Sequence, residues 1–419
     1  MTDTFTKRTP QLVRRHASEK RFQWLGRIAI TIAIGFLLVM VGTIGWMGAG
    51  ALKQTQISLQ VYFDPQEIDI NAVAKADYGA LVKTALRATF PDVKKRRDKR
   101  KLYKLLSSQA AFSLRRQVME NPGLIGQTKK IWFIASDDVD MFTKANISVG
   151  PNGNAGKLDE KQLQWITILE KSGAIRTRFN SGFFLSGDSR EPELAGILSA
   201  FAGTALTLIV CFLLSFPVGI LAAIYLEEFI PENRWSDLIE VNINNLAAVP
   251  SIVFGLLGLA VFLNTFGLPR SSPLVGGMVL ALMTLPTIII ASRAALRSVS
   301  PSIREAALGI GATRIQMVFH HVAPLAMPGM LTGAIIGMAR ALGETAPLLM
   351  IGMVAFIVDT PTSILQPATA LPVQIFLWAD SPERGFLEKT SAAIIVLIAF
   401  LVAMNLIAII LRNKYRQRF

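Results

Sequence analysis

Arg340 and Glu344 are the two residues whose types and spacing most clearly suggest chemistry. They lie near the middle of Gly329–Ile357, a stretch that is otherwise apolar enough to cross a bilayer. A charged residue at the centre of a spanning helix costs roughly 2.5–3.5 kcal/mol on insertion scales, so such residues usually face a bundle interior or an aqueous path. Because they are four positions apart on a helix, the guanidinium and the carboxylate are expected to share one face and reach each other.

This pair is suited to the passage of an anion. The Arg340 guanidinium presents five donors in a planar fork that matches carboxylate or phosphate oxygens. Glu344 would hold that fork when the site is empty and limit the dwell time of the anion, because a site that binds too tightly cannot release. Thr345 could donate a hydroxyl hydrogen bond to the anion, although a bond to its own helix backbone is commoner. The alternative for the pair is an internal ion pair that only fixes helix packing.

Composition places the chain in a membrane. Its 419 residues are 52% hydrophobic and 17% charged, with a mean hydropathy of +0.44, which is typical of a polytopic membrane protein rather than a soluble domain. The single cysteine, Cys211, and the three histidines predict neither a disulfide framework nor a metal site. The formal net charge of +14 could suggest a nucleic-acid partner. Much of it lies at the chain ends and membrane flanks, where basic residues set topology, so we expect no nucleic acid.

Six long apolar segments are expected to span the bilayer. They are Ile28–Met47, Leu194–Leu226, Val241–Pro269, Ser271–Ser292, Gly329–Ile357 and Thr390–Leu411. The first could instead be a signal peptide, but signal cores span only about 7–15 residues and the basic lead here is long, so a retained helix is expected. Four prolines fall within these segments and are expected to be tolerated, because neighbouring helices can satisfy the freed backbone groups. They are Pro217, Pro250, Pro286 and Pro347.

The basic residues of the short connecting segments predict the orientation. Residues 1–27, the segment from Arg293 to Arg314 and the tail after Leu411 are basic, which places all three in the cytoplasm. Six spans bring both termini to that side and leave residues 52–192 outside the cytoplasm. The acidic segment Glu227–Glu232 fits this orientation poorly, but acidic residues contribute little to the rule.

Residues 52–192 are polar and have the size of an ordinary domain. Period-two alternation over Ile57–Phe63 predicts a half-buried strand. Further strands are expected at 131–135 and 174–179, helices at 78–90, 99–119 and 160–171, and a turn at 150–154, which together indicate an α+β domain. The basic run Lys94–Lys101 could attract anionic headgroups or an anionic solute. Such a run is more often a solvated helix face.

A short segment between the fourth and fifth spans should face the cytoplasm and bind a partner. Ser302 with Glu305 three residues later predicts a capping box at the start of a helix, which is the plain role for Glu305. The apolar residues over 303–319 are many for a surface segment, so a partner groove is expected for them. Gly311 would permit a bend between two short helices.

The same segment resembles a family signature. The run Glu305-Ala306-Ala307, followed by Gly311 and Pro324, matches the EAA signature of ABC importer permeases. In that family this loop forms a coupling helix that docks into a groove of the cytoplasmic ATPase subunit. The resemblance therefore implies a coupling helix over 302–320. The residues implied to contact the ATPase subunit are Glu305, Ala306, Ala307 and Gly311.

The second half of the signature departs from the family pattern. His321 and Ala323 stand where Ile and Leu are usual. These two exchanges weaken the second half of the signature more than its docking half.

Another stretch resembles one branch of these importers. Ala339–Leu349, with the sequence ARALGETAPLL, is similar to the PstA family of phosphate permeases, which pair with PstC-like permeases. Asn245–Gly258 and Leu371–Phe376 agree with that family, and Ala248 stands where glycine is commoner. The resemblance covers about residues 194–419, and the first span matches in kind. The insert resembles an extra extracytoplasmic region of some PstA-like proteins and carries no assignable motif.

The resemblance implies an all-α polytopic membrane protein with the type I ABC importer permease fold and an inserted α+β extracytoplasmic domain. Its divisions are a cytoplasmic N-terminus at 1–27, a first transmembrane helix at 28–51, the insert at 52–192, and a five-helix core at 193–419. The implied assembly lies in a bacterial inner membrane. It contains a homologous PstC-like permease, two PstB-like ATPase subunits carrying ATP and Mg, and a PstS-like phosphate-binding protein.

This chain is not expected to hydrolyse ATP or to bind a cofactor itself. The nearest approach to a Walker A sequence, Gly153–Leu158, has the wrong glycine spacing and lacks Ser or Thr after the lysine. Two other hypotheses remain open. A permease for another oxyanion, such as sulfate or molybdate, should keep the coupling helix but lack the Arg340–Glu344 stretch. A membrane sensor with an external ligand domain would need a cytoplasmic signalling domain, and the tail after Leu411 leaves no room for one.

Overall fold

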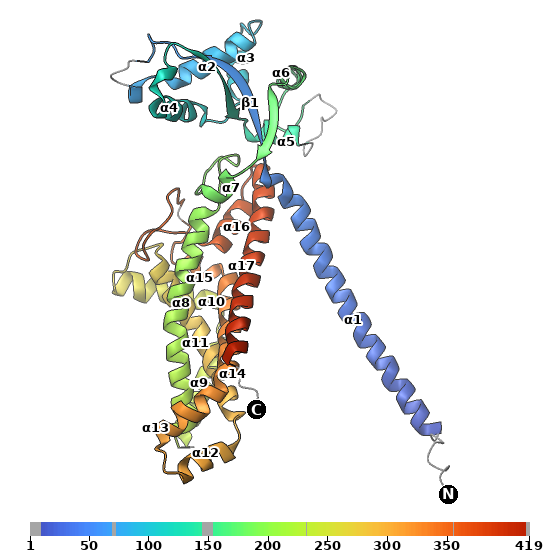
Figure 1. The fold of residues 1–419 in the computed structure, drawn as a ribbon, viewed down its shortest axis with the longest axis vertical. Coiled ribbons are helices and arrows are strands. Elements are labelled where there is room, and N and C mark those ends of the chain that lie inside the picture. Colours follow the sequence, from blue (N-terminus) through green and yellow to red (C-terminus); the bar gives the residue numbers. More distant parts are fainter. Residues whose placement is uncertain (1–9, 69–72, 145–153, 232, 355, 416–419) are drawn as a thin grey trace.

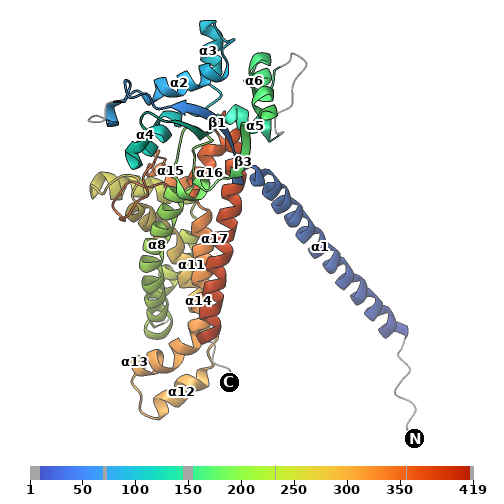
Figure 2. The same ribbon diagram turned by 45° about the horizontal axis from the view of Figure 1, so that its top comes forward.

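The structure is a computed structural model that describes residues 10–68, 73–144, 154–231, 233–354 and 356–415. A bundle of helices forms the main body, a small α+β domain lies at one end of it, and helix α1 (Pro10–Gly48) diverges from both (Figure 1). The turned view in Figure 2 shows the same three parts. The expected helical membrane fold with an inserted α+β domain is confirmed.

Helix α1 begins well before the expected first span, because the basic lead continues the apolar helix without a break. None of the most apolar window of this helix is buried in the described part of the chain. Its end meets helix α17 (Gly385–Tyr415), where a Cβ on Gly48 would lie 2.7 Å from the backbone nitrogen of Ala392. An apolar helix left uncovered in this way requires lipid or another subunit around it.

The inserted domain is built on an antiparallel sheet with the strand order β2-β1-β3. The strands are β1 (Lys53–Tyr62), β2 (Thr128–Ile134) and β3 (Ile175–Phe179), and Gln56 lies opposite both Ile134 and Arg176. One face of the sheet is buried under helices. Alternate β1 residues from Ile57 onwards belong to the main core of the domain. The helices are α2 (Tyr78–Thr89), α3 (Arg96–Tyr103), α4 (Ala110–Glu120), α5 (Asp137–Thr143), α6 (Glu160–Lys171) and α7 (Gly182–Leu185).

The expected helix at 99–119 is wrong, because the chain forms two helices there, α3 and α4. The connecting residues extend the sheet instead. Ser107 donates its backbone N–H to Ile134, and Leu105 accepts one from Ser136. These bonds replace those that a continuous helix would make. The expected turn at 150–154 lies almost wholly outside the described residues.

The bundle is organised around α11 (Pro273–Arg297), whose most apolar window is 61% buried, more than that of any other candidate span. It packs between α8 (Leu198–Ile224) and α14 (Ala323–Gly343). Gly329 and Gly333 of α14 lie directly against Ala295 and Ala291 of α11, so small side chains let the two backbones approach closely. The remaining elements are η4 (Tyr225–Phe229), α9 (Arg234–Ala247), α10 (Ser251–Leu257), η5 (Gly258–Thr265), α12 (Pro301–Gly309), α13 (Arg314–Gln316), η6 (Met317–Val322), α15 (Ala346–Met350) and α16 (Leu371–Ala379).

Among the described residues, five helices are long and apolar enough to span a membrane, and a bent pair makes a possible sixth. That pair, Arg234–Ala247 with Ser251–Thr265, turns by 100° at its break. The span expected at 241–269 is therefore bent and does not form one helix. The span expected at 329–357 is wrong in its bounds, because α14 ends at Gly343. Two prolines explain both breaks. A proline ring clashes with the carbonyl four residues earlier, which for Pro347 is that of Gly343 and for Pro250 is that of Leu246. Pro217 and Pro286 lie inside continuous helices, as expected.

Candidate substrate path and coupling surface

Arg340 and Glu344 lie together at the end of α14. Arg340 occupies the last turn of the helix, and Glu344 is its C-cap residue with an extended backbone (φ −81°, ψ 124°). The Arg340 Nε lies 3.7 Å from the Glu344 Oε1. The two charges therefore meet as the sequence predicts. The expectation that they sit on one continuous helix, near its middle, is wrong.

The pair lies on the side of α14 that the rest of the chain leaves open. The Arg340 side chain is 44% exposed and that of Glu344 21%. Ile336, one helical turn earlier on the same face, is 56% exposed, whereas Ala341, about 100° further around the helix, is 1% exposed. A guanidinium facing lipid would be costly. This face therefore requires an aqueous path, a second subunit, or both.

The two broken spans meet beside this site. A Cβ on Gly255 of α10 would lie 2.7 Å from the Cα of Pro347, so the backbones of α10 and α15 are in close contact. Non-helical backbone at membrane depth is tolerated where it is buried in protein or lines a water-filled cavity, and transporters bind substrates at such interrupted helices. Reasoning from the sequence missed this feature. Its signals were Pro250 and Pro347, which were expected to be tolerated.

Thr345 begins helix α15 as its N-cap residue. Its side chain makes no capping hydrogen bond, while its carbonyl accepts the N–H of Leu349 at 2.9 Å. The residue thus lies directly beside Glu344 at the break. Its proposed contact with an anion stays a prediction.

At the opposite end of the bundle, α12 begins at Pro301, with Ser300 as the N-cap residue and no side-chain capping bond. The predicted capping box of Ser302 and Glu305 is therefore wrong. The N-cap position lies two residues earlier, at Ser300, because proline is well suited to the first helical position. The Ser302 hydroxyl lies 2.8 Å from that of Ser300. Glu305 is exposed and is not a member of a capping box.

The predicted coupling segment 302–320 is two helical pieces with a bend between them. Gly311 lies at the bend with a φ of +90°, a value that glycine adopts without strain, so the predicted bend is confirmed. The second piece starts at α13 with a capping box of Thr313 and Gln316. It then continues through η6 into α14, so that Arg314–Gly343 forms one 30-residue helix. The coupling segment and Arg340 are therefore at opposite ends of the same helix.

This end of the molecule exposes large apolar side chains. Ala307 is buried and packs in a cluster with Met317 and Val318, which holds α12 against η6. Ala306 beside it is exposed. The exposed apolar residues are Leu308, Ile310, Ile315 and Phe319, of which Ile310 is 82% exposed. An apolar surface of this kind, on the tip farthest from the inserted domain (Figure 1), indicates a protein partner.

Ion pairs fix the same region to the ends of α8 and α11. Arg304 Nη2 lies 2.6 Å from Glu228 Oε1 and donates to the carbonyl of Leu296. Glu227 lies between Arg293 and Arg297, at 3.3 and 2.7 Å. The acidic segment that fits the charge rule poorly therefore pairs with the basic segment. Both lie at one end of the bundle, and the side of the membrane that this end faces stays a prediction. Which residues would pair could not be predicted from their spacing in the chain.

Comparisons with known families agree with this architecture. Residues 215–419 match the family described as binding-protein-dependent transport system inner membrane component. Residues 9–150 match a domain of unknown function, DUF3333. The helical core, the interrupted spans and the exposed segment 302–320 thus define a membrane component of a binding-protein-dependent transport system.

Individual relatives identify the branch of this family to which the chain belongs. The chain is 32% identical over 261 residues to the phosphate transport system permease protein PstA 1 of Mycobacterium tuberculosis (strain CDC 1551 / Oshkosh), which covers 61% of this chain and 83% of that protein. It is 32% identical over 225 residues to PstA of Xylella fastidiosa (strain Temecula1 / ATCC 700964), covering 53% and 77%. An inward-facing structure of the MetNI methionine ABC transporter aligns over 53% of this chain and 95% of that chain, at 18% identity and a TM-score of 0.42. The chain belongs to the PstA family of phosphate transport system permease proteins.

Proposed function

We propose that this chain is the permease subunit of an ATP-driven importer and moves inorganic phosphate across the membrane by alternating access. Its membership of the PstA family supports phosphate as the substrate. One structural observation carries the mechanism. The forked cation Arg340 lies on the open face at one end of the Arg314–Gly343 helix, and the coupling surface lies at the other end.

The Arg340–Glu344 pair acts as a reversible anion site. A phosphate ion competes with the Glu344 carboxylate for the guanidinium, whose fork can bond two phosphate oxygens at once. The distance of 3.7 Å between Nε and Oε1 is longer than a normal hydrogen bond, so the carboxylate does not saturate the donors. Because the helix ends here and Thr345 directly follows Glu344, we expect the Thr345 hydroxyl to assist.

The partners follow from the surfaces that this chain leaves uncovered. The open face of α14 and the uncovered α1 suit a homologous, PstC-like permease. The exposed apolar tip suits a cytoplasmic ATPase subunit, two of which serve the pair of permeases and hold the ATP and Mg that this chain does not bind. A PstS-like binding protein delivers phosphate from outside. In a bacterial inner membrane, both termini then face the cytoplasm and the insert lies outside the cytoplasm.

Energy reaches the phosphate site along one helix. Closure of the ATPase subunits on ATP displaces α12 through Glu305 and its neighbours. Arg304 and the buried Ala307 couple α12 to the bundle, and the helix from Arg314 to Gly343 transmits the movement. The break after Gly343 and the break at 248–250 allow the site to open to one side at a time, because interrupted helices can re-pack without bending a continuous hydrogen-bonded helix.

Phosphate uptake into vesicles containing the whole importer tests this function. Arg340→Ala should lower the uptake rate at least about tenfold, since hydrogen bonds to a charged group contribute about 1.5–3 kcal/mol each, and the complex should still assemble. Arg234→Ala, which removes an exposed arginine at the start of α9, is the matched control and should transport normally. Uptake that persists in Arg340→Ala would make the pair structural. Uptake of sulfate or molybdate in place of phosphate would favour a permease for another oxyanion.

A further inference from the structure

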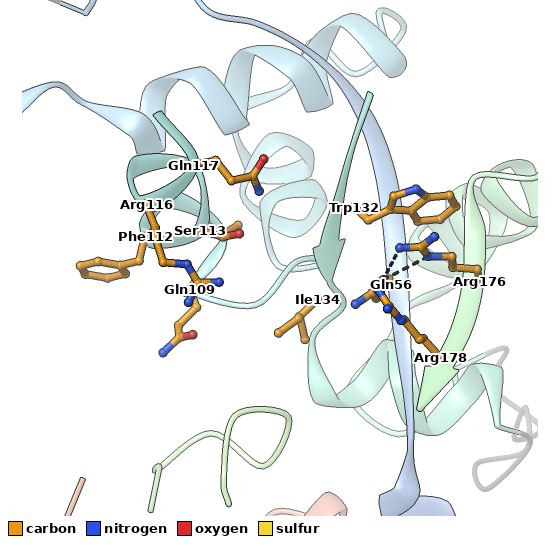
Figure 3. A pocket seen from close by; sticks show the side chains of 11 residues that line it. Gln56, Gln109, Phe112, Ser113, Arg116, Gln117, Trp132, Ile134, Arg176 and Arg178 are labelled. Carbon is orange, nitrogen blue, oxygen red and sulfur yellow. Dashed lines mark hydrogen bonds between the residues drawn. The ribbon is translucent and has the colours of Figure 1, made fainter. Parts of the chain in front are cut away.

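The inserted domain contains a polar cavity of about 550 Å³ (Figure 3). It lies on the sheet face opposite the core, because its strand residues alternate with the buried ones at Ile57 and Phe133. Helix α4 forms its other wall with side chains from its uncovered face. The cavity is lined by Gln56, Gln109, Ala110, Phe112, Ser113, Arg116, Gln117, Trp132, Ile134, Arg176 and Arg178.

The charge of this lining is entirely positive. Three of the residues are arginines, and none of the lining residues is acidic. The remaining polar groups are glutamine amides and a serine hydroxyl, which can donate hydrogen bonds. In contrast, one cation of the basic run on α3 is paired with an acidic residue from outside the run, because Lys101 pairs with Asp159. The cavity therefore combines three cations with neutral hydrogen-bond donors around an enclosed space, which an exposed helix face does not offer.

Arg176 is held in place without being neutralised. Its Nε and Nη2 donate to the Gln56 Oε1 at 3.1 and 2.9 Å, and its guanidinium carbon lies 3.9 Å from the centroid of the Trp132 ring. A neutral amide and an aromatic face fix the guanidinium but leave its charge uncompensated. Such preorganised cations bind oxyanions with a smaller ordering cost than free arginines.

The other two arginines flank the cavity from opposite sides. Figure 3 shows Arg116 on α4 at one side and Arg178 with Arg176 on β3 at the other, with Ile134 between them. The side chain of Arg116 is 76% exposed, and its ion pair with Glu120 is loose at 3.9 Å. Both flanking arginines can therefore move towards a bound anion.

We propose that this cavity is a second anion site, which binds a phosphate-class oxyanion as the free ion or as the phosphate of a lipid headgroup. The ligand is compact and polar, because Arg176 already covers a face of Trp132 and leaves that face unavailable for stacking. The volume accommodates a hydrated phosphate or a small phosphate ester. The site shares no residue with the α14 path, so the proposal goes beyond the transport function.

Equilibrium binding of radiolabelled inorganic phosphate to the full chain in phosphatidylcholine nanodiscs tests the proposal. An Arg340→Ala background removes the contribution of the path. In this background, Arg116→Gln with Arg178→Gln should weaken phosphate binding about tenfold or more. Arg96→Gln with Arg97→Gln removes the same charge from exposed positions of α3 and should change binding less than about twofold. The altered residues of both variants are exposed arginines, so both should fold.

A second arm identifies the source of the phosphate group. Fluorescent phosphatidylglycerol is titrated into the same nanodiscs. If the ligand is a lipid headgroup, the cavity variant loses lipid binding and the α3 variant does not. The site is supported if the cavity variant, and not the α3 variant, loses binding of phosphate or of the lipid. The site is overturned if the cavity variant binds both ligands normally, or if the α3 variant loses as much binding as the cavity variant.

Discussion

In the proposed path, Arg340 and Glu344 are expected to have opposite effects on a passing anion, although they are four residues apart. Arg340 is the more exposed of the two and would attract phosphate. Glu344 would compete with phosphate for the same donors. A transporter needs both effects, because strong attraction alone would trap its substrate. The loose distance between the two side chains is what such competition requires.

Glu344→Gln should therefore bind phosphate more tightly and release it more slowly. Two unit charges about 4 Å apart interact by at least about 1 kcal/mol even in water, so removing the carboxylate should lower the half-saturating phosphate concentration about fivefold or more. The maximal uptake rate should fall at the same time. Both quantities come from uptake measured over a range of phosphate concentrations. An unchanged half-saturating concentration would show that the carboxylate does not compete.

The meeting of these two side chains could be predicted from their spacing, but not the end of the helix between them. Whether Pro347 breaks a helix depends on whether neighbouring groups can satisfy the carbonyl of Gly343, and no local pattern contains that information. Pro217 and Pro347 look alike in the sequence, yet only the first lies inside a continuous helix. The break at Pro250 could not be predicted for the same reason, so the contact between α10 and α15 could not be predicted either.

At the scale of elements, the continuous helix from Arg314 to Gly343 is the link between the two candidate sites. The bend at Gly311 and the apolar character of the coupling segment were both predictable, because a glycine and a set of apolar residues are local signals. The anchoring of α12 by Arg304 and Glu228 joins residues far apart in the chain and was not predictable. The predicted helix at 99–119 failed for the same reason, since its middle pairs with the end of β2.

Glu305→Ala tests the coupling role directly. Because Glu305 is exposed and takes no part in a capping box, the substitution should leave thermal stability unchanged within about 0.5 kcal/mol. It should reduce ATP-driven uptake several-fold and weaken association with the ATPase, without changing the half-saturating phosphate concentration. Ser302→Ala, on the same helix, is the control and should behave like the unaltered chain. Normal uptake with Glu305→Ala would remove this residue from the coupling contact.

At the scale of the whole molecule, buried charges join the inserted domain to the bundle. Lys144 of the insert lies between two carboxylates, Asp140 of α5 and Glu388 of α17. Its Nζ lies 3.2 Å from the Glu388 Oε2. The side chains of Lys144 and Glu388 are 8% and 10% exposed. Breaking one partner of a buried ion pair is strongly destabilising, so the insert and the start of α17 should move together.

The pH dependence of this junction follows from two further carboxyl groups. Burial raises the pKa of Asp137 to about 6, and the neighbouring Asp138 and Asp140 add to the shift. Burial also raises the pKa of Glu193 to about 7, with Glu191 acting in the same direction. The folded chain holds these protons more tightly than the unfolded chain, whose carboxyl pKa values are about 4. Their contribution to stability is therefore complete below about pH 4 and is lost as the pH rises through 6 and 7.

The melting temperature of the purified chain in detergent should accordingly fall as the pH rises from 5 to 8. Glu193→Gln cannot ionise, so it should reduce this slope and melt higher than the unaltered chain at pH 8. Glu160→Gln, an exposed carboxylate at the start of α6, should keep the original slope. A slope that is identical in all three proteins would show that the junction does not titrate in this range.

Water access to the end of α14 is the most direct test of the whole scheme. Replacing Cys211 by serine removes the single cysteine, after which Glu344→Cys can be labelled by a charged, membrane-impermeant thiol reagent in the assembled importer. The same substitution at Leu213, an exposed apolar position of α8, is the control. We expect fast labelling at position 344 that phosphate slows and that changes when ATP is added. Labelling as slow as at position 213, with or without ATP and phosphate, would contradict the presence of an anion path at this site.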